Sequence, residues 1–228
     1  MTDMDRAAAL APAIGLVAAL HGGCGGCGGD EVTPFVSGVD PLEAENHAPL
    51  PAPTATDPFP ELLVSVHGEA GGYVWAHARG YVHAAPADVR AAMTAPAVCV
   101  DRRRAATWSV MEDVEPEYDV SFRIHMVVED IITVEFDVTW RHDTLAAGDG
   151  GAELFASRWK KTDGTSFISR LEGSVLLLPA SPDQPVTEVQ LIEHLDAAGG
   201  GWEEIDQFLH DFYASILAQV RGEPLPTY

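Results

Sequence analysis

The stretch that decides the fold is GGGWEEIDQFLHDFYASILAQVRG, residues 199–222. Its large apolar side chains recur at steps of three and four, so one side of an α-helix is apolar and the other polar. Glu203 and Glu204 place negative charge in the first turn, which the helix dipole favours. Gly222 and Pro224 end the helix. The sequence therefore predicts an amphipathic helix whose apolar face must be buried: Trp202, Ile205, Phe208, Leu209, Phe212, Ile216 and Val220.

The region before this helix has the period of a β-sheet. Residues 118–128 and 132–140 carry an apolar residue at every second position, and Glu129 and Asp130 separate the two runs. This pattern predicts an antiparallel hairpin with one face in water. The same period predicts further strands at residues 73–83, 108–114, 153–161, 166–178 and 187–195.

Two short helical segments interrupt the strands near the start of the domain. Pro86 opens the first segment, and Pro96 ends it, because proline fits the first turn of a helix and blocks its interior. The second segment follows at residues 97–105. A short strand or helix is also expected to begin at Leu62.

An antiparallel sheet and a long helix, each with one apolar face, bury those faces most simply when the sheet curves around the helix. This layout resembles the helix-grip fold of the SRPBCC superfamily, which includes steroidogenic acute regulatory (START) lipid-transfer domains, the birch pollen allergen and bacterial polyketide cyclases. The resemblance lies in GYVHAAPADVRAAM at residues 80–93, SVLLLPASPDQPVTEVQLIEHLDA at 174–197 and the stretch 199–222. It implies an α+β domain over residues 62–222, with about seven antiparallel strands curved around the C-terminal helix and two short helices after the first strand.

Members of that superfamily hold hydrophobic small molecules in a cavity between the sheet and the helix. The resemblance therefore implies that this chain binds a hydrophobic small molecule or lipid; we expect binding without catalysis because few residues are placed for chemistry. The small residues Ala76, Ala78 and Gly80 would leave room for it. The expected ligand-binding residues are Val82, Phe122, Ile124, Phe136, Val138, Trp140, Leu191, Phe208, Phe212 and Ile216.

The sequence offers few candidates for chemistry. The domain contains no paired metal-ligand spacing, phosphate-binding loop or nucleophile elbow, so we expect no metal, no cofactor and no catalytic residue. His77, His83 and His125 fall on faces expected to point outward. Glu193 shares the apolar face of its strand, where a carboxyl group would have a perturbed pKa and could bind a polar ligand group. A position at the rim or at the end of the strand is the simpler expectation.

Three functions remain open at this point. The first is a binding protein for a hydrophobic molecule. The second is a cyclase- or dehydratase-like enzyme, which would need Glu193 to converge with Arg158 or Tyr118 in a pocket. The third is a structural or partner-binding protein with a filled core and an exposed aromatic patch, formed by Tyr73, Trp75 and Tyr81.

The charge of the chain excludes one class of partner. Aspartate and glutamate number 35 against 13 lysines and arginines, which gives a formal net charge of −22. Such a surface repels the phosphate backbone, so no nucleic acid partner is expected. The one basic cluster, residues 102–104, is interpreted as a solvated helix end or loop.

The first 24 residues are typical of an export signal. Residues 7–20 form an apolar run of the length of a signal-peptide core, which is short for a membrane span. Cys24 follows small residues, and this resembles the cleavage site of bacterial lipoproteins, where such a cysteine is lipidated and starts the mature chain. We therefore expect a signal or lipoprotein segment at residues 1–24, with lipidation at Cys24. Simple secretion and an uncleaved segment remain alternatives.

The next segment is expected to be a spacer. Residues 25–61 are rich in proline and acidic residues and contain no lysine or arginine, which predicts a disordered, extended tether. Cys24 and Cys27 lack the second ligand pair or following helix that metal or redox chemistry would need. The expected order is a lipid anchor in the membrane, a tether, the domain and a short tail at residues 223–228. This order implies a bacterial cell-envelope protein, lipid-anchored or periplasmic.

Overall fold

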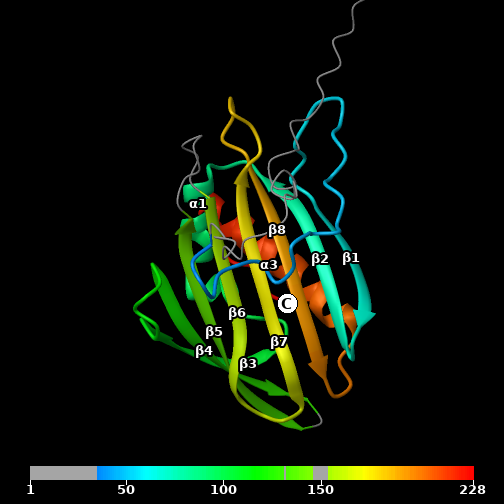
Figure 1. The fold of residues 1–228 in the computed structure, drawn as a ribbon, viewed down its shortest axis with the longest axis vertical. Helices are drawn as coiled ribbons and strands as arrows, with labels where there is room; N and C mark the ends of the chain where they lie inside the picture. The colour runs from blue at the N-terminus through cyan, green and yellow to red at the C-terminus, as the bar shows by residue number, and fades with distance from the viewer. Residues whose placement is uncertain (1–34, 131, 146–153) are drawn as a thin grey trace, which may run out of the picture. The chain divides into compact units, whose positions relative to one another are not determined.

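Eight antiparallel strands form one curved sheet in the part of the chain that the computed structural model describes, residues 35–130, 132–145 and 154–228 (Figure 1). Their order across the sheet is β1-β2-β8-β7-β6-β5-β4-β3. The segments expected to form the signal and the lipidated cysteine lie outside the described residues. The strands are β1 (Leu63–Ala70), β2 (Tyr73–Val82), β3 (Ala105–Glu112), β4 (Val120–Glu129), β5 (Thr133–Leu145), β6 (Leu154–Gly164), β7 (Ile168–Pro179) and β8 (Thr187–Ala197).

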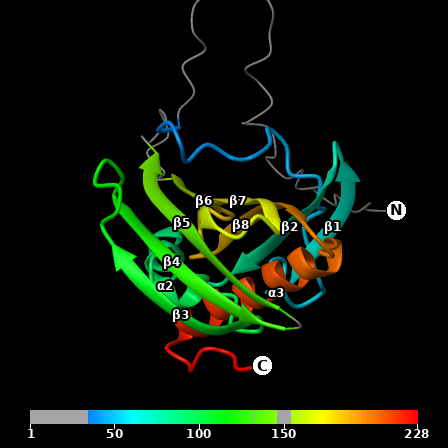
Figure 2. The same ribbon diagram turned by 90° about the horizontal axis from the view of Figure 1, so that it is seen from below.

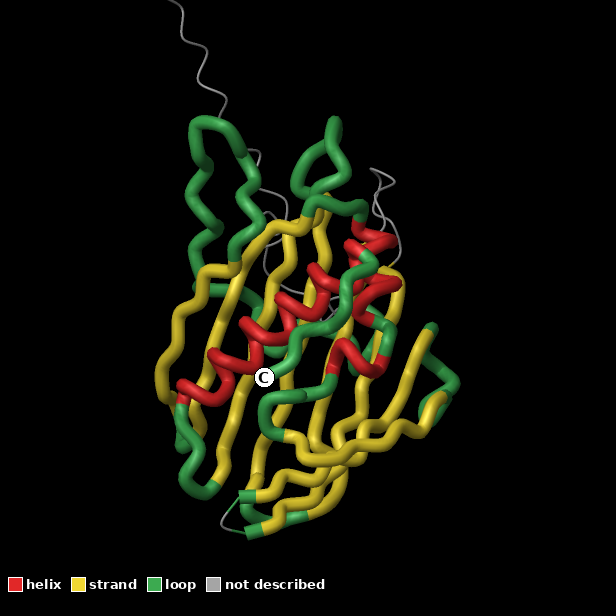
Figure 3. The backbone as a smooth tube through the Cα atoms, turned by 180° about the vertical axis from the view of Figure 1, so that it is seen from behind, coloured by secondary structure: helices red, strands yellow, loops and turns green. Residues whose placement is uncertain are grey.

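The long C-terminal helix lies in the hollow of this sheet. Figure 2 shows the strands curving around α3, and Figure 3 shows α3 crossing the concave face diagonally. The helices are α1 (Pro86–Met93), α2 (Pro96–Cys99) and α3 (Trp202–Arg221). This arrangement confirms the predicted α+β helix-grip fold. Among the described residues, no helix has both the length and the apolar character needed to span a bilayer.

The ends of α3 follow from its sequence. Glu204 accepts a hydrogen bond from the backbone N–H of Gly201 at 2.6 Å and so satisfies a donor that the first turn leaves unpaired. Gly222 ends the helix with φ at 65°, a left-handed conformation that glycine adopts without strain. The predicted apolar stripe is buried at its centre, where Ile205, Leu209 and Phe212 pack on the sheet.

Residues 102–104 form a turn in which Arg103 and Arg104 are exposed, as expected, and their side chains also fasten α3 to the edge of the sheet. Arg102 donates a hydrogen bond to Ser215 Oγ at 2.6 Å. Arg103 forms an ion pair with Asp211 at 2.8 Å. Two arginines of the basic cluster therefore form ion pairs with acidic residues on the polar side of α3: Arg103 with Asp211 and Arg104 with Glu204.

Residues 35–61 differ from the expected tether. Figure 1 shows this segment, in blue, crossing in front of β6, β7 and β8 while α3 lies behind them. The side chain of Asn46 donates hydrogen bonds to the carbonyl oxygens of Ala78 and Leu191, at 3.1 and 2.9 Å. Val39 is fully buried. Composition shows that this segment cannot build a core of its own, but it packs on the outer face of a sheet that other residues form.

The sheet has one more strand than the expected seven. The residues after Leu62 form β1, an eight-residue edge strand paired with β2. The apolar alternation in this segment is weak because Gly68 interrupts it, and the ring of Trp75 lies where a side chain at that position would project. The sequence therefore identified the start of this element but not its type or length.

Candidate functional site

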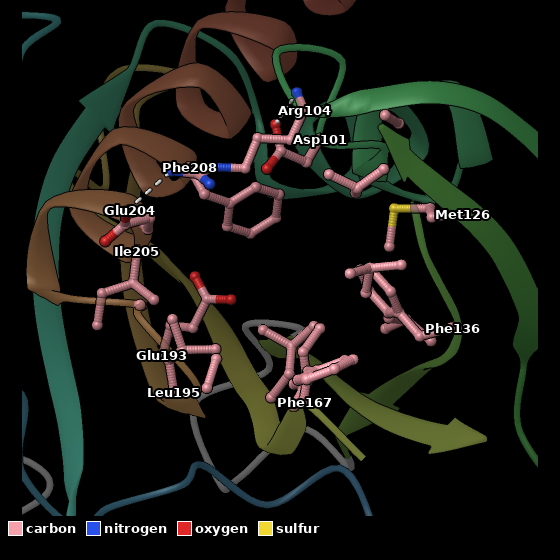
Figure 4. Close-up of a pocket in the computed structure, with 18 of the residues that line it drawn as sticks. Asp101, Arg104, Met126, Phe136, Phe167, Glu193, Leu195, Glu204, Ile205 and Phe208 are labelled. Carbon is pink, nitrogen blue, oxygen red and sulfur yellow. Dashed lines mark hydrogen bonds and ion pairs between the residues drawn. The ribbon is translucent and has the colours of Figure 1, made fainter. Parts of the chain in front are cut away.

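A cavity of about 360 Å³ lies between the N-terminal half of α3 and the strands β4 to β8 (Figure 4). Ile205 and Phe208 of α3 close one side of it. At one end it is bounded by Ile132 and Phe167, which are 48% and 50% exposed. The cavity therefore reaches the surface where the β4–β5 and β6–β7 turns lie.

The cavity contains some of the predicted ligand-binding residues but not all of them. Phe136, Val138, Trp140 and Phe208 line it. The remaining predicted residues are buried in the packed core and do not border this cavity: Val82, Phe122, Ile124, Leu191, Phe212 and Ile216.

The reason for this division is the path of α3. The hydrophobic period of a strand shows which side chains point inward. It does not show which of these inward side chains contact α3 and which border the cavity. Ala76 and Ala78 of β2 are fully buried in the same core cluster as Ile205 and Leu209 of α3. They do not line the cavity, so the room expected beside them is not part of it.

Sequence reasoning missed the residues at the mouth. Met126 and Val128 continue the inward face of β4, so the period of residues 118–128 contained the signal for them. Ile132 and Phe167 were placed in predicted strands, at residues 132–140 and 166–178, but in the structure they lie in the turns just before β5 and β7. The sequence did not show that these two turns lie together at one end of the cavity.

Two stacked tryptophans form the wall of the cavity. The rings of Trp140 and Trp159 are 4.6 Å apart and nearly parallel. A Cβ atom at Gly173 would overlap the Trp159 ring, so the glycine allows this indole to lie flat across β7. Gly173 pairs with Glu193 in the sheet register. The indole of Trp159 therefore extends toward Glu193.

Glu193 projects into the cavity from β8 (Figure 4). It is 2% exposed, which differs from the rim position that the sequence favoured. Burial raises the pKa of the Glu193 carboxyl well above its ordinary value; the indole N–H of Trp159 opposes this, and the negative charge of Asp101 adds to it. The indole does not reach full hydrogen-bond geometry, so Glu193 Oε2 and Trp159 Nε1 both lack a partner among the described residues.

The charged groups around the cavity are mostly acidic. Asp101, Asp130 and Glu204 line it, and Arg104 is the one basic residue among its described lining residues. Arg104 forms an ion pair with Glu204 at 3.2 Å. Burial raises the pKa of Asp101, although backbone N–H groups and the Arg104 charge oppose the change. No unpaired cation is therefore left to bind an anionic ligand among these residues.

The residues required for the enzyme hypothesis do not converge. Arg158 donates a hydrogen bond to the carbonyl oxygen of Asp40 at 3.0 Å, and Tyr118 donates one to that of Ser37 at 3.1 Å. Both acceptors belong to the segment on the outer face of the sheet. Glu193 projects from the inner face, so the proposed set of three is divided between the two faces.

A buried histidine elsewhere in the core is also unsuited to acid–base catalysis. The Nδ1 atom of His142 is 2.7 Å from Ser157 Oγ. Burial, with the positive charge of Arg90, lowers the pKa of His142 to about 3. His142 does not line the cavity described above, and a fully buried neutral imidazole in the core has no access to a substrate there.

A second cluster of titratable residues lies on the outer face. Glu43 Oε1 is 2.8 Å from His194 Nε2 and 3.5 Å from His77 Nε2. Ligand atoms of these three residues lie within 4.8 Å of one another, close enough to surround a metal ion. His77, which the sequence placed on a solvated face, is buried beneath this segment.

The hydrogen bonds of His77 argue against a metal at this cluster. Its Nδ1 accepts a hydrogen bond from the backbone N–H of His47 at 2.9 Å. In neutral imidazole the ring proton must then sit on Nε2, which faces Glu43. A metal ligand needs that nitrogen free of its proton. The cluster therefore fits a hydrogen-bonded fastening of residues 35–61 to the sheet better than a metal centre.

The aromatic patch expected for a partner-binding surface is only partly exposed: Tyr81 is buried, and Tyr73 and Trp75 are partly buried. The three residues expected to form it, Tyr73, Trp75 and Tyr81, lie on the outer face of β2. Other side chains of the same unit pack on them: Arg170 on Tyr73, His47 on Trp75 and Phe59 on Tyr81.

The comparisons with known proteins concern the fold. No protein-family model and no curated protein sequence matches the chain. Among solved structures, the lipid transfer and protein localization domain of human StarD13 is similar at 13% identity over 70% of this chain and 83% of that chain, with a TM-score of 0.47. Human StAR-related lipid transfer protein 5 is similar at 11% identity over 70% and 82% of the two chains, with a TM-score of 0.46.

A bacterial enzyme has a similar backbone. The Zhui aromatase/cyclase from Streptomyces sp. R1128 is 10% identical over 71% of this chain and 93% of that chain, with a TM-score of 0.40. At this level of identity the likeness concerns the fold alone. The role of the cavity has to be argued from its own residues.

Proposed function

We propose that this protein binds a hydrophobic small molecule or lipid in the cavity beneath α3 and does not transform it. The observation that carries the proposal is a cavity of about 360 Å³ with walls of aromatic and aliphatic side chains. Small-molecule pockets fall in the range of roughly 300 to 1,000 Å³ and are mainly apolar with a few polar groups. This cavity has both properties.

Packing energetics support a bound ligand. Protein interiors contain few voids larger than a water molecule, because each void forfeits contacts between its lining atoms. This cavity opens at Ile132 and Phe167, so without a ligand its aromatic and aliphatic walls face water, which is unfavourable. A ligand that fills the space beside Trp140 and Phe208 restores those contacts.

The direct test is to ask what the purified protein carries. An organic extract analysed by mass spectrometry should contain a hydrophobic molecule in stoichiometric amount. After extraction, the protein should bind Nile red saturably, and Leu171→Trp, which fills the cavity, should abolish that binding. Leu62→Trp is the matched control, because Leu62 is exposed and remote from the cavity. An empty extract together with no saturable binding would contradict the proposal.

We also propose that the protein is held in a bacterial cell envelope by lipid attached to Cys24. The apolar run at residues 7–20 and the small residues around Cys24 support this. Metabolic labelling with a clickable fatty acid in a bacterial host tests it. Label should be lost in Cys24→Ser and kept in Cys27→Ser. Equal labelling of both variants would contradict the assignment.

A further inference from the structure

Glu193 and Trp159 present a complementary pair of unpaired groups to the cavity. Glu193 Oε2 and Trp159 Nε1 are buried, and neither has a hydrogen-bond partner among the described residues. Buried polar groups in folded proteins are almost always paired, because an unpaired group loses its hydration and gains nothing. The Trp159 indole lies close enough to Glu193 to oppose the rise of its pKa, but the two groups do not form a hydrogen bond of good geometry, so a polar ligand atom beside both would complete the pair.

The surroundings of Glu193 leave its carboxyl free for a ligand. Its neighbours in the register of the sheet are Ala76 on β2 and Gly173 on β7, and neither can form a hydrogen bond through its side chain. Figure 4 shows the carboxyl pointing into the open space, away from the strand. No protein group competes with a ligand for it from these two positions.

We propose that the ligand carries a hydroxyl group on an apolar body, and that this hydroxyl binds between Glu193 and Trp159. The inference rests on the proposed function and names the ligand class of the same site. A hydroxyl oxygen accepts a hydrogen bond from the indole N–H, and its proton is donated to the carboxyl group. One atom thereby satisfies both unpaired groups.

The same two residues select against other polar heads. An ammonium group has no lone pair to accept the N–H of Trp159, so it can satisfy Glu193 only. A carboxylate would add negative charge beside Glu193, with Asp101, Asp130 and Glu204 also around the cavity. Arg104, the one cation among the described residues that line the cavity, is already paired with Glu204. A carboxylate head is therefore excluded.

The experiment compares four probes that share one alkyl chain: 1-dodecanol, its methyl ether, dodecylamine and dodecanoate. Each displaces Nile red from the full-length, delipidated protein at pH 7. The alcohol should bind roughly two- to tenfold more tightly than the ether, which cannot donate a hydrogen bond to the carboxyl oxygen of Glu193, because a net hydrogen bond contributes that factor. Dodecanoate should bind most weakly.

Three variants separate the two groups. Glu193→Leu should reduce the alcohol-to-ether ratio to about one, with ether binding in the same variant as the reference for any general change in the affinity of the cavity. Glu193→Gln should keep most of the ratio, because an amide both donates and accepts. Trp159→Phe should reduce alcohol binding a few-fold with the aromatic wall retained. The ether controls in each variant show that the cavity is still formed.

The outcomes distinguish this inference from the proposed function. If no probe displaces Nile red and Nile red itself does not bind saturably, the proposed function fails. If all four probes bind but the alcohol-to-ether ratio is the same in wild type and Glu193→Leu, the hydroxyl site is wrong and the cavity remains a binding site. Tighter binding of dodecylamine or dodecanoate than of the alcohol would also overturn the hydroxyl assignment.

Discussion

Glu43 and Glu193 lie against opposite faces of strand β8, and their surroundings differ. On the outer face, Glu43 Oε1 accepts a hydrogen bond from His194 at 2.8 Å and faces a second imidazole, that of His77. On the inner face, Glu193 Oε2 has no partner among the described residues. The outer site is complete and fastens one segment of the chain to another. The inner site is incomplete, and we therefore attribute to it a partner that is not part of the protein.

The two faces should also differ in rigidity, and glycine substitutions test this most strongly. A tryptophan lies over a glycine on each face: Trp159 over Gly173 inside and Trp75 over Gly68 outside. The inner ring is 1% exposed and is stacked on Trp140, whereas Trp75 is only partly buried. We expect Gly173→Ala to reduce the free energy of unfolding by about 3 kcal/mol, because the buried ring cannot move aside.

The matched outer substitution sharpens the contrast. Gly68→Ala should cost only about 1 kcal/mol, since the Trp75 ring can shift toward solvent. Urea unfolding followed by circular dichroism measures both values. Equal losses for the two variants would show that the inner wall is no more rigid than the outer face.

The second test removes the outer carboxylate. Glu43→Ala leaves His77 and His194 without their acceptor, which should reduce the free energy of unfolding by about 2 kcal/mol. Hydrogen exchange of residues 35–48 should increase at the same time, because the cluster fastens that segment. Glu45→Ala is the control, because Glu45 is an exposed acidic residue of the same segment. An unchanged exchange rate in Glu43→Ala would contradict the fastening role.

The third test uses pH, because the stability linked to Glu193 on the inner face and to His77 on the outer face should change with pH in opposite directions. Burial raises the pKa of Glu193, so the stability linked to its proton is full below the ordinary value of 4.5 and is lost as pH rises through the raised value. Burial lowers the pKa of His77, although Glu43 opposes the change. Its contribution is therefore present above 6.5 and is lost as pH falls.

Glu193→Gln isolates the contribution of Glu193 to the pH dependence of the free energy of unfolding. The variant cannot ionise, so its advantage over wild type should grow with pH above 4.5, by at most about 1.4 kcal/mol per pH unit. Urea midpoints at a series of pH values, converted to free energies, give this difference. A constant difference between pH 4 and 9 would mean that the carboxyl titrates normally and is hydrated in the cavity.

The sequence predicted the elements whose pattern is local. The stripe in residues 199–222 and the alternation in 118–140 depend only on neighbouring residues, and both gave the right element and the right inner face. The docking of residues 35–61 was not predictable in this way. It depends on an outer sheet face that exists only after β2 and β8 have paired, and composition alone favoured a tether.

For Glu193, the strand alternation with Leu191 and Leu195 predicted the correct inner face, but a rim position was the simpler expectation because burying a charge is costly. The structure keeps the inner position, where burial raises the pKa of the carboxyl and so favours its neutral form. The division of predicted ligand residues between cavity and core has another cause, since it depends on the angle at which α3 crosses the sheet.

The smallest expected effect concerns Arg104 at the cavity mouth. Its ion pair with Glu204 is partly exposed, so Arg104→Gln should change the free energy of unfolding by no more than about 0.5 kcal/mol. Removing this cation leaves the cavity more acidic, and dodecanoate should then bind even more weakly while 1-dodecanol is unaffected. Nile red displacement by the two probes measures both effects. A loss of alcohol binding equal to that in Glu193→Leu would show that the mouth, and not the inner carboxyl, selects the ligand.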